Sequence, residues 1–451
     1  MKKQVLTAYR VLVPERVKQR IPPRLKAAVL GLAYDLTGYP DLRLWQMRHL
    51  YKVGDGEKRS LNIADPLLSC ALRPTAPAPE ADRSPGSFYG EFGFLGLKIN
   101  GRVRDRAAVA DGKVDLWLDG HLLRRIGLVP SPDGTARILF TIRRPALEMF
   151  PERGKLAIRD LSGRPLHVDL RFFRSDQRPD TPCTGIDFDI PFGAGTLPAH
   201  LEQVGTLDKK GWPRLTDAEL VQRQSRMLEL YGRVNAVFQE EFGRPLFLLY
   251  GTLLGQVREG DFIPGDDDFD VGYVSEARTT PQIKAEAVQI MERLVARGFI
   301  VSLNHLGRPH RIRDVQSGGP EIHLDNHIVF APGDGHVWIH PRARLPLPLD
   351  AFRAVETVTM RGVEVIRPAG AEAFLEAHYG SDWRIPDPGY ANFTTAQDRA
   401  VARLLRAVCL TRKEQRSLAR GIQQRQLPGE FVAASLEHPY PIENWARRVG
   451  F

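Results

Sequence analysis

The sequence has few cysteines and lacks a long apolar run. Its 451 residues include only Cys70, Cys183 and Cys409, none of which forms a C-x-x-C pair. Neither a disulfide framework nor a cysteine zinc site is supported, and a reducing compartment is expected. The longest apolar runs, such as residues 27–34, fall short of the roughly 18 residues that cross a bilayer. No secretory signal is expected either, because charged residues follow residues 11–13 at once.

The body of the chain also lacks an excess of charge of either sign. Residues 1–60 hold 13 Lys and Arg against 5 Asp and Glu, whereas the other 391 residues hold 63 − 13 = 50 basic and 54 − 5 = 49 acidic groups. A near-neutral body has no basic stripe that could follow a nucleic-acid backbone, so nucleic acid is not an expected partner. The length suggests two or three folded domains.

Residues 1–72 are predicted to form a basic, amphipathic helical leader. Apolar residues recur near helical spacing from Val11 to Leu36, next to arginines and lysines, and Pro22 and Pro23 divide the stretch. Two interpretations stay open. The stretch can lie on an anionic membrane surface through residues 1–60, or it can pack on its own domain with a solvated basic face.

The next two segments are predicted to be a proline-rich linker at 73–87 and a β domain at 88–195. The linker contains four prolines and no large apolar residue. The β domain shows alternation with a period of two at Val114, Leu116 and Leu118, at residues 136–142 and at residues 156–158. This pattern predicts a small antiparallel β-sandwich-like domain.

From residue 200 the pattern alternates between helix and strand, which predicts a mixed α/β unit over 200–400. A helix after Thr216 or Asp217 carries an apolar face from Leu220 to Phe238, and a second helix is expected at 281–297. Strands are expected at 246–250, 266–274, 322–330 and near Ile300 and His310. Residues 401–451 are predicted to be a helical extension, so the whole chain is an α+β multidomain protein.

A run of aspartates follows the strand at 246–250. If residues 266–274 are one extended strand, then Asp266, Asp268 and Asp270 share a face and Asp267 lies on the other. Three carboxylates on one face repel one another unless a hard cation neutralises them, and oxygen ligands favour Mg²⁺ or Mn²⁺. A solvated acidic turn is the alternative. An EF-hand is excluded, since Val271 and Ala277 occupy the positions that require Gly and Glu.

The pattern G-T-L-L-G-x-x-R-x-x-x-F-I-P-x-D-D-D-x-D at residues 251–270 resembles the signature of the LicD family, which includes fukutin and the fukutin-related proteins. The resemblance covers about 215–390 and implies a nucleotidyltransferase-like fold with three metal-binding aspartates. It implies Asp268, Asp270 and, on a later strand, Asp325 as metal ligands. Asp266 is then a further ligand or a base. Gly265 departs from the family pattern, and the cysteines with which some animal relatives bind zinc are missing.

The same resemblance implies further substrate-binding residues. Gly251 and Thr252 form the corner that approaches phosphate, and Arg258 lies in the motif. Independently of the resemblance, Arg311 and Arg313 lie on one face of a predicted strand and are candidate phosphate clamps or ordinary surface arginines. His323, in H-x-D with Asp325, is a candidate substrate contact, although a structural role is preferred for both His323 and His327. Tyr379 and Trp383, in the closing Y-G-x-x-W segment, are expected to pack.

The function implied by the resemblance is transfer of a phosphorylated alcohol from a nucleotide diphosphate donor to a glycan. A CDP-linked donor is expected, and the acceptor is a cell-surface polysaccharide or its lipid-linked precursor. The location implied is cytoplasmic, with peripheral attachment to the inner face of the membrane. Two other functions stay open, a nucleic-acid nucleotidyltransferase and a non-catalytic glycan-binding protein. The sequence does not determine the number of subunits.

Overall fold

The computed structural model describes residues 66–77, 84–173, 177–304, 310–314, 322–339, 343–386 and 406–435, apart from Phe94, with a few helical positions between Pro22 and Ala33. The chain forms two compact units that divide between Thr216 and Asp217. Each unit is described by itself. None of the helices in these ranges is both long and apolar enough to cross a bilayer.

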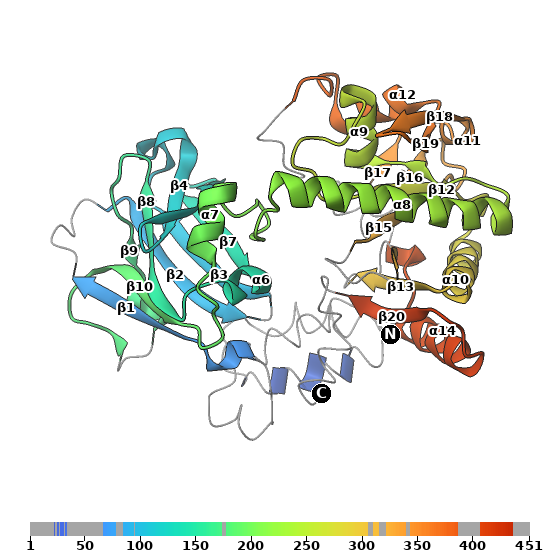
Figure 1. Ribbon diagram of the computed structural model, residues 1–451. Helices are drawn as coiled ribbons and strands as arrows, with labels where there is room; N and C mark the ends of the chain where they lie inside the picture. Colours follow the sequence, from blue (N-terminus) through green and yellow to red (C-terminus); the bar gives the residue numbers. More distant parts are fainter. Residues whose placement is uncertain are drawn as a thin grey trace. The chain divides into compact units, whose positions relative to one another are not determined.

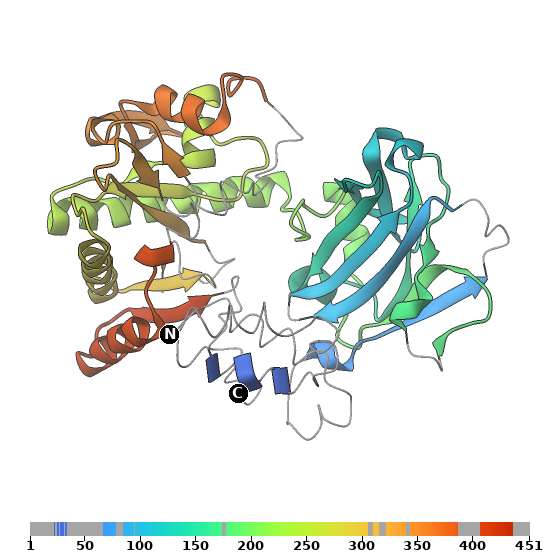
Figure 2. The same ribbon diagram turned by 180° about the vertical axis from the view of Figure 1, so that it is seen from behind.

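The first unit is a β-sandwich of two five-stranded sheets, drawn mainly in blue and green in Figures 1 and 2. One sheet has the order β1 (Ala71–Pro77), β10 (Cys183–Asp189), β8 (Arg153–Asp160), β4 (Lys113–Leu118) and β5 (His121–Gly127). The other has the order β6 (Val129–Pro130), β7 (Ala136–Arg143), β3 (Gly96–Val103), β2 (Gly86–Gly93) and β9 (His167–Val168). All pairs are antiparallel except β2 with β9.

The alternation seen in the sequence sets the core of the sandwich. Val114, Leu116 and Leu118 of β4 are fully buried, and so are Ile138 and Ile142 of β7. Side chains from both sheets belong to a single apolar cluster, as expected where two sheets bury their inner faces against each other. The period-two prediction is confirmed for these strands.

The structure corrects the predicted linker and both boundaries of the β domain. Residues 73–77 belong to strand β1, which pairs with β10 at the edge of its sheet. Prolines are tolerated there because an edge strand leaves half of its N–H groups without a ladder partner. At the other end, Leu197 and Leu201 of α7 (Leu197–Val204) and Leu207 enter the sandwich core, so this unit extends beyond residue 195.

The second unit is built on an eight-stranded mixed sheet. Its main path is β11 (Phe247–Leu248), β12 (Asp270–Val274), β15 (Leu324–Phe330), β14 (His310–Asp314), β13 (Phe299–Asn304) and β20 (Glu430–Ser435). Strands β16 (Val337–Ile339) and β17 (Ala343–Leu345) extend from β15, and β18 (Val355–Met360) pairs with β19 (Val363–Pro368). The helices are α8 (Asp217–Phe242), α9 (Tyr250–Glu259), α10 (Thr280–Ala296), α11 (Asp350–Arg353), α12 (Ala371–Tyr379) and α14 (Arg412–Gln424).

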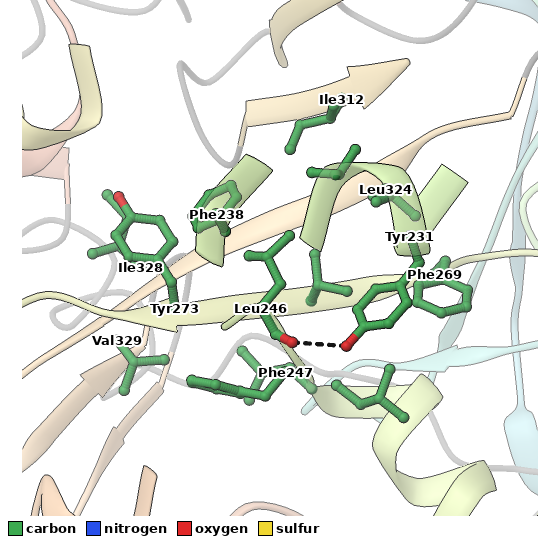
Figure 3. Close-up of a cluster of buried hydrophobic side chains, with 14 of the residues drawn as sticks. Tyr231, Phe238, Leu246, Phe247, Phe269, Tyr273, Ile312, Leu324, Ile328 and Val329 are labelled. Atoms are coloured by element: carbon green, nitrogen blue, oxygen red, sulfur yellow. Dashed lines mark hydrogen bonds between the residues drawn. The ribbon is translucent and has the colours of Figure 1, made fainter. Parts of the chain in front are cut away.

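Helix α8 packs its predicted apolar face into the core of this unit. Met227, Leu228, Tyr231, Val234 and Phe238 are all buried, and the helix ends before Gly243, whose φ is +62°. Figure 3 shows Tyr231 and Phe238 among buried side chains of the sheet, with the Tyr231 hydroxyl donating to the carbonyl of Leu246 at 2.8 Å. This packing holds α8 across the strands that carry the aspartates.

Two further expectations are corrected in this unit. The strand predicted at 266–274 begins only at Asp270, so residues 266–269 are an irregular segment before it. The C-terminal segment is not only helical, because β20 pairs in parallel with β13. Most of the predicted leader lies outside the described residues. Within it, Leu25, Val29 and Leu32 are helical and more than half exposed.

Candidate active site

The candidate site begins at the corner where β11 passes into α9. The N–H of Leu249 donates to the carbonyl of Asp270 at 3.0 Å, and the Thr252 hydroxyl accepts from the N–H of Asp270 at 2.8 Å. Tyr250 adopts a φ of +44°, which is uncommon for a residue with a side chain and marks a sharp turn into the helix. Thr252 is almost fully buried, so it fixes the first residue of β12 in place.

The irregular segment at 266–268 places three carboxylates together. One oxygen from each of Asp266, Asp267 and Asp268 lies within 4.8 Å of the others. The sequence prediction had Asp267 on the opposite face, which is wrong because these residues precede the strand and do not alternate as extended backbone does. A Cβ on Gly251 would be 3.5 Å from a carboxylate oxygen of Asp266, so the start of α9 lies next to this group.

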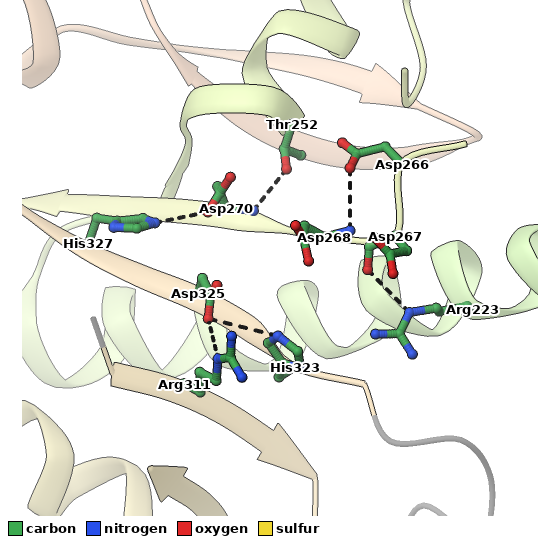
Figure 4. A network of polar contacts seen from close by, with 10 residues as sticks. All are labelled: Arg223, Thr252, Asp266, Asp267, Asp268, Asp270, Arg311, His323, Asp325 and His327. Carbon is green, nitrogen blue, oxygen red and sulfur yellow. Dashed lines mark hydrogen bonds and ion pairs between the residues drawn. The ribbon is translucent and has the colours of Figure 1, made fainter. Parts of the chain in front are cut away.

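Helix α8 holds this segment through Gln224 and Arg223, of which Figure 4 shows Arg223. The Gln224 amide donates to the carbonyl of Asp266 at 2.8 Å, and the Arg223 guanidinium donates to the carbonyl of Asp267 at 3.2 Å. Sequence reasoning missed both residues. Gln224 had a detectable signal, because it is a polar residue on the apolar stripe of α8 and is 2% exposed.

The parallel pairing of β12 with β15 brings Asp325 to the site. Asp270 is the direct register partner of Asp325, and the N–H of Asp325 donates to the carbonyl of Phe269 at 2.9 Å. Figure 4 shows Asp266, Asp268, Asp270 and Asp325 gathered beside the start of α9. Acidic residues that are about 55 positions apart in the chain therefore meet at one place on the sheet.

Each of the two strand aspartates has a basic partner. Asp270 is bonded to Nε2 of His327 at 2.9 Å, and Asp325 accepts from Nε of Arg311 at 2.9 Å. Nε2 of His323 lies 3.8 Å from the Asp325 carboxylate, and Nδ1 of His323 is buried without a hydrogen-bond partner among the described residues. His327 therefore orients Asp270, in line with the structural role preferred from the sequence, while Arg311 orients Asp325.

The surroundings of the site shift the pKa values of its ionisable groups. Burial, followed by the charges of Asp268 and Asp270, raises the pKa of Asp266 to about 7. Burial also raises the pKa of Asp270, although His327 opposes it. Burial is also the largest single influence on the pKa of Asp325 and would raise it, but Arg311, His323 and His327 together outweigh burial, so the net shift is downward. Burial, followed by Arg311, lowers the pKa of His323 to about 3, so its imidazole is neutral at pH 7.

These residues fit a hard divalent cation. The donor set consists of carboxylate oxygens, which Mg²⁺ and Mn²⁺ prefer. The raised pKa values of Asp266 and Asp270 reflect burial first and neighbouring negative charge second, and a bound cation would offset both. Asp268 belongs both to the group at 266–268 and to the expected set with Asp270 and Asp325. It is therefore the residue on which either arrangement of ligands depends.

The other predicted contacts are distributed differently from the expectation. Arg258 pairs with Glu259 at 2.6 Å and reaches the carbonyl of Trp383 at 3.4 Å, so it ties α9 to the segment after α12. Arg313 is buried, and its register partner on β13 is Ile300, whereas Asp325 is the register partner of Arg311. Neither Arg311 nor Arg313 is an ordinary surface arginine. Trp383 is buried in the core, as expected for a packing residue.

The fold and the acidic site define a mixed α/β domain in which two neighbouring strands and a helix corner bring carboxylates together. Residues 243–369 match the family model described as LicD/FKTN/FKRP, nucleotidyltransferase domain. The resemblance to the LicD family is therefore confirmed, and these residues are a LicD domain. The chain is also 28% identical over 159 residues to the human ribitol 5-phosphate transferase FKRP, over 34% of this chain and 31% of that protein. The match thus spans about a third of the length of that relative.

Proposed function

We propose that the protein is a metal-dependent transferase that moves a phosphorylated alcohol from a nucleotide diphosphate donor, CDP-linked, to a cell-surface glycan or its lipid-linked precursor. The group moved is phosphocholine, glycerol phosphate, ribitol phosphate or a sugar phosphate. The observation that carries this proposal is the register of Asp270 against Asp325 within a LicD domain, because it places the acids of two strands at one site. The name of the human relative supports a phosphorylated alcohol as the group transferred.

The reaction would join an acceptor hydroxyl oxygen to the donor phosphorus that bears the alcohol. The bond from that phosphorus to the nucleoside monophosphate breaks, and the hydroxyl proton passes to a base. Asp266 suits this base, because its carboxylate lies within the acidic group and is not one of the three proposed metal ligands. The Asp266 carboxylate lies beside the start of α9, where free N–H groups and the helix dipole favour phosphate oxygens.

The remaining residues position these groups. Asp268, Asp270 and Asp325 would hold Mg²⁺ or Mn²⁺, which supplies neutralisation of the charge on the transferred phosphate. His327 keeps Asp270 in one orientation, and Arg311 orients Asp325. Gln224 of α8 fixes the segment that carries Asp266. Phosphoryl transfer requires mainly positioning and charge neutralisation, and this arrangement is suited to both.

A donor screen tests the proposal directly. Purified protein is incubated with CDP-choline, CDP-glycerol, CDP-ribitol or UDP-sugars, with Mg²⁺, Mn²⁺ or EDTA, and release of the nucleoside monophosphate is measured. We expect release from at least one CDP-alcohol that depends on the divalent cation. Release that persists in EDTA, or no release from any donor in the presence of an acceptor glycan extract, would contradict the proposed function.

We also propose that the leader holds the protein on an anionic membrane surface, at the cytoplasmic inner face where such donors are made. Leu25, Val29 and Leu32 lie on one helical face and are 53%, 53% and 62% exposed, and the first 60 residues carry the basic surplus. Apolar side chains flanked by Lys and Arg are suited to the boundary between headgroups and acyl chains.

Flotation with vesicles tests the leader. We expect the full-length protein to float with phosphatidylserine-containing vesicles, and replacement of Leu25, Val29 and Leu32 by serine to weaken binding by about tenfold or more. Val221→Ser is the matched control, because Val221 is an equally exposed apolar residue on α8. Point substitutions are preferable to removal of residues 1–70, since Leu67 is buried in the sandwich core. Equal flotation of the triple variant and the parent protein would refute the membrane role.

A further inference from the structure

The outer face of the sandwich sheet that contains β2, β3 and β7 carries an unusual row of side chains. Tyr89 of β2 pairs with Asn100 of β3, and Asn100 pairs with Leu139 of β7. Their neighbours Phe88, Ile99 and Ile138 fill the sandwich core, so these three residues point to the opposite face. Cross-strand partners have Cβ atoms about 5 Å apart, so the row is a continuous surface.

An aromatic platform covers one end of this row. The ring of Phe172 stacks on that of Tyr89 with centroids 3.5 Å apart and an angle of 8° between the planes, yet Phe172 is 56% exposed. The short helix η5 (Leu170–Phe172) that carries it is fixed by Asp169, which accepts from the N–H of Arg171 and pairs with its guanidinium at 2.7 Å. The N–H of Asp169 donates to the carbonyl of Phe88 at 2.7 Å, and this bond fixes the platform to β2.

Asn100 lies in the middle of the row with an unsatisfied amide. Its side chain is 7% exposed, and its Nδ2 has no hydrogen-bond partner among the residues that the structure describes. A buried N–H group without a partner destabilises a fold, so an asparagine at this position needs a reason. A ligand that brings an oxygen to the row would supply the missing acceptor.

The surroundings of the row are polar. Glu91 and Lys98 form the next cross-strand pair, and on the other side Arg102 bonds to Asp133 at 2.6 Å. Leu139, which is 44% exposed, supplies one apolar contact at the far end. Burial, followed by the charges of Glu91 and Asp169, raises the pKa of Tyr89, so its phenol stays protonated at neutral pH.

We infer that this row, Leu139–Asn100–Tyr89 with Phe172 stacked on it, is a saccharide-binding surface. The exposed ring face of Phe172 suits the C–H face of a pyranose, as aromatic faces favour partially positive C–H groups, and the Asn100 amide suits a hydroxyl or N-acetyl oxygen. A protein partner fits less well, because three apolar side chains are too few for an interface of about 1,200–2,000 Å². The surface would hold a glycan independently of the transferase site, so the inference does not depend on the proposed activity.

The test uses the full-length protein and three defined probes, maltohexaose, cellohexaose and N-acetylchitohexaose. Saturation-transfer difference NMR and calorimetry measure their binding. We expect at least one probe to bind. The largest saturation transfer should reach the protons of the sugar ring that contacts Phe172. Phe172→Ala should weaken binding by about tenfold or more, whereas Phe172→Trp should retain it. Val221→Ala on α8 is the control, as Val221 is 51% exposed and lies outside the sandwich.

A second variant separates binding from stability. Asn100→Leu removes the unsatisfied amide with little change of volume, so we expect weaker saccharide binding together with an unchanged or higher unfolding temperature. A merely structural asparagine would show no change in binding. The inference is overturned if none of the three probes binds, or if Phe172→Ala and Asn100→Leu bind the probe as tightly as the parent protein does.

Discussion

Replacing Asp268 by asparagine is expected to lower turnover by roughly 10³-fold or more while the fold stays intact. Asp268 shares the carboxylate group with Asp266 and Asp267, and its charge acts on both Asp270 and Asp325. Asparagine keeps the shape of the side chain but removes its negative charge. The attraction for a divalent cation is therefore lost, and the packing is retained.

The same substitution should have the opposite effect on stability. Removing one of several like charges relieves repulsion, so the Asp268→Asn protein in EDTA should unfold at the same temperature as the parent or higher. Mg²⁺ or Mn²⁺ should raise the unfolding temperature of the parent and not that of the variant, since only the parent binds the ion in its folded state. Cation-dependent nucleotide release and thermal unfolding measure the two effects.

Asp350→Asn is a matched control for this experiment. It removes the same charge at an exposed position on α11, where Asp350 pairs with Arg353 on the surface. Turnover of the control should equal that of the parent. Near-parental, cation-dependent turnover of Asp268→Asn would mean that the acidic site has been assigned wrongly.

Replacing Asp266 by asparagine is expected to change how stability depends on pH. The pKa of Asp266 rises from 3.8 to about 7 on folding, so the folded state binds this proton more tightly than the unfolded state. The parent therefore loses stability as pH rises from about 4 to about 7, at up to about 1.4 kcal/mol per pH unit. In EDTA, the free energy of unfolding of Asp266→Asn, compared with that of the parent, should therefore increase by about 2 kcal/mol between about pH 5.5 and about pH 8.

The comparison of the two proteins removes the contribution of the histidines. Burial lowers the pKa of His310 and His323 to about 3, so both act in the opposite direction, weakening the fold as pH falls below about 6.5. They are present in both proteins and cancel in the difference. Urea unfolding at several pH values measures the free energy of unfolding of both proteins. Mg²⁺ should reduce the difference in this free energy between Asp266→Asn and the parent. A difference that does not vary with pH would show that Asp266 titrates normally.

Local patterns in the sequence were sufficient for much of the fold. Alternation with period two located β4, β7 and β8, and the apolar stripe of α8 predicted a helix whose bounds agree with the structure. The residues 251–270 were sufficient to suggest the LicD family. These features depend on the spacing of residues within one segment, and this spacing can be read directly from the sequence.

Other features depended on contacts between distant segments. The prolines of 73–77 suggested a linker because their composition carries no sign that β10 accepts them as an edge strand. The short segment at 430–435 becomes β20 only through its pairing with β13. In both cases the deciding partner lies more than 100 residues away, beyond the reach of any local pattern.

The candidate site divides in the same way. The sequence by itself determined the aspartate-rich segment and the preference of its oxygens for a hard cation, because the chemistry of a carboxylate does not depend on the fold. The tertiary structure decided which acids meet. The parallel register places Asp325 beside Asp270, and the irregular segment before β12 brings Asp267 to the same group. The strand order places Arg311 opposite Asp325, whereas Arg313 is buried opposite another strand. Register between strands is set by burial of the whole sheet, which no single segment encodes.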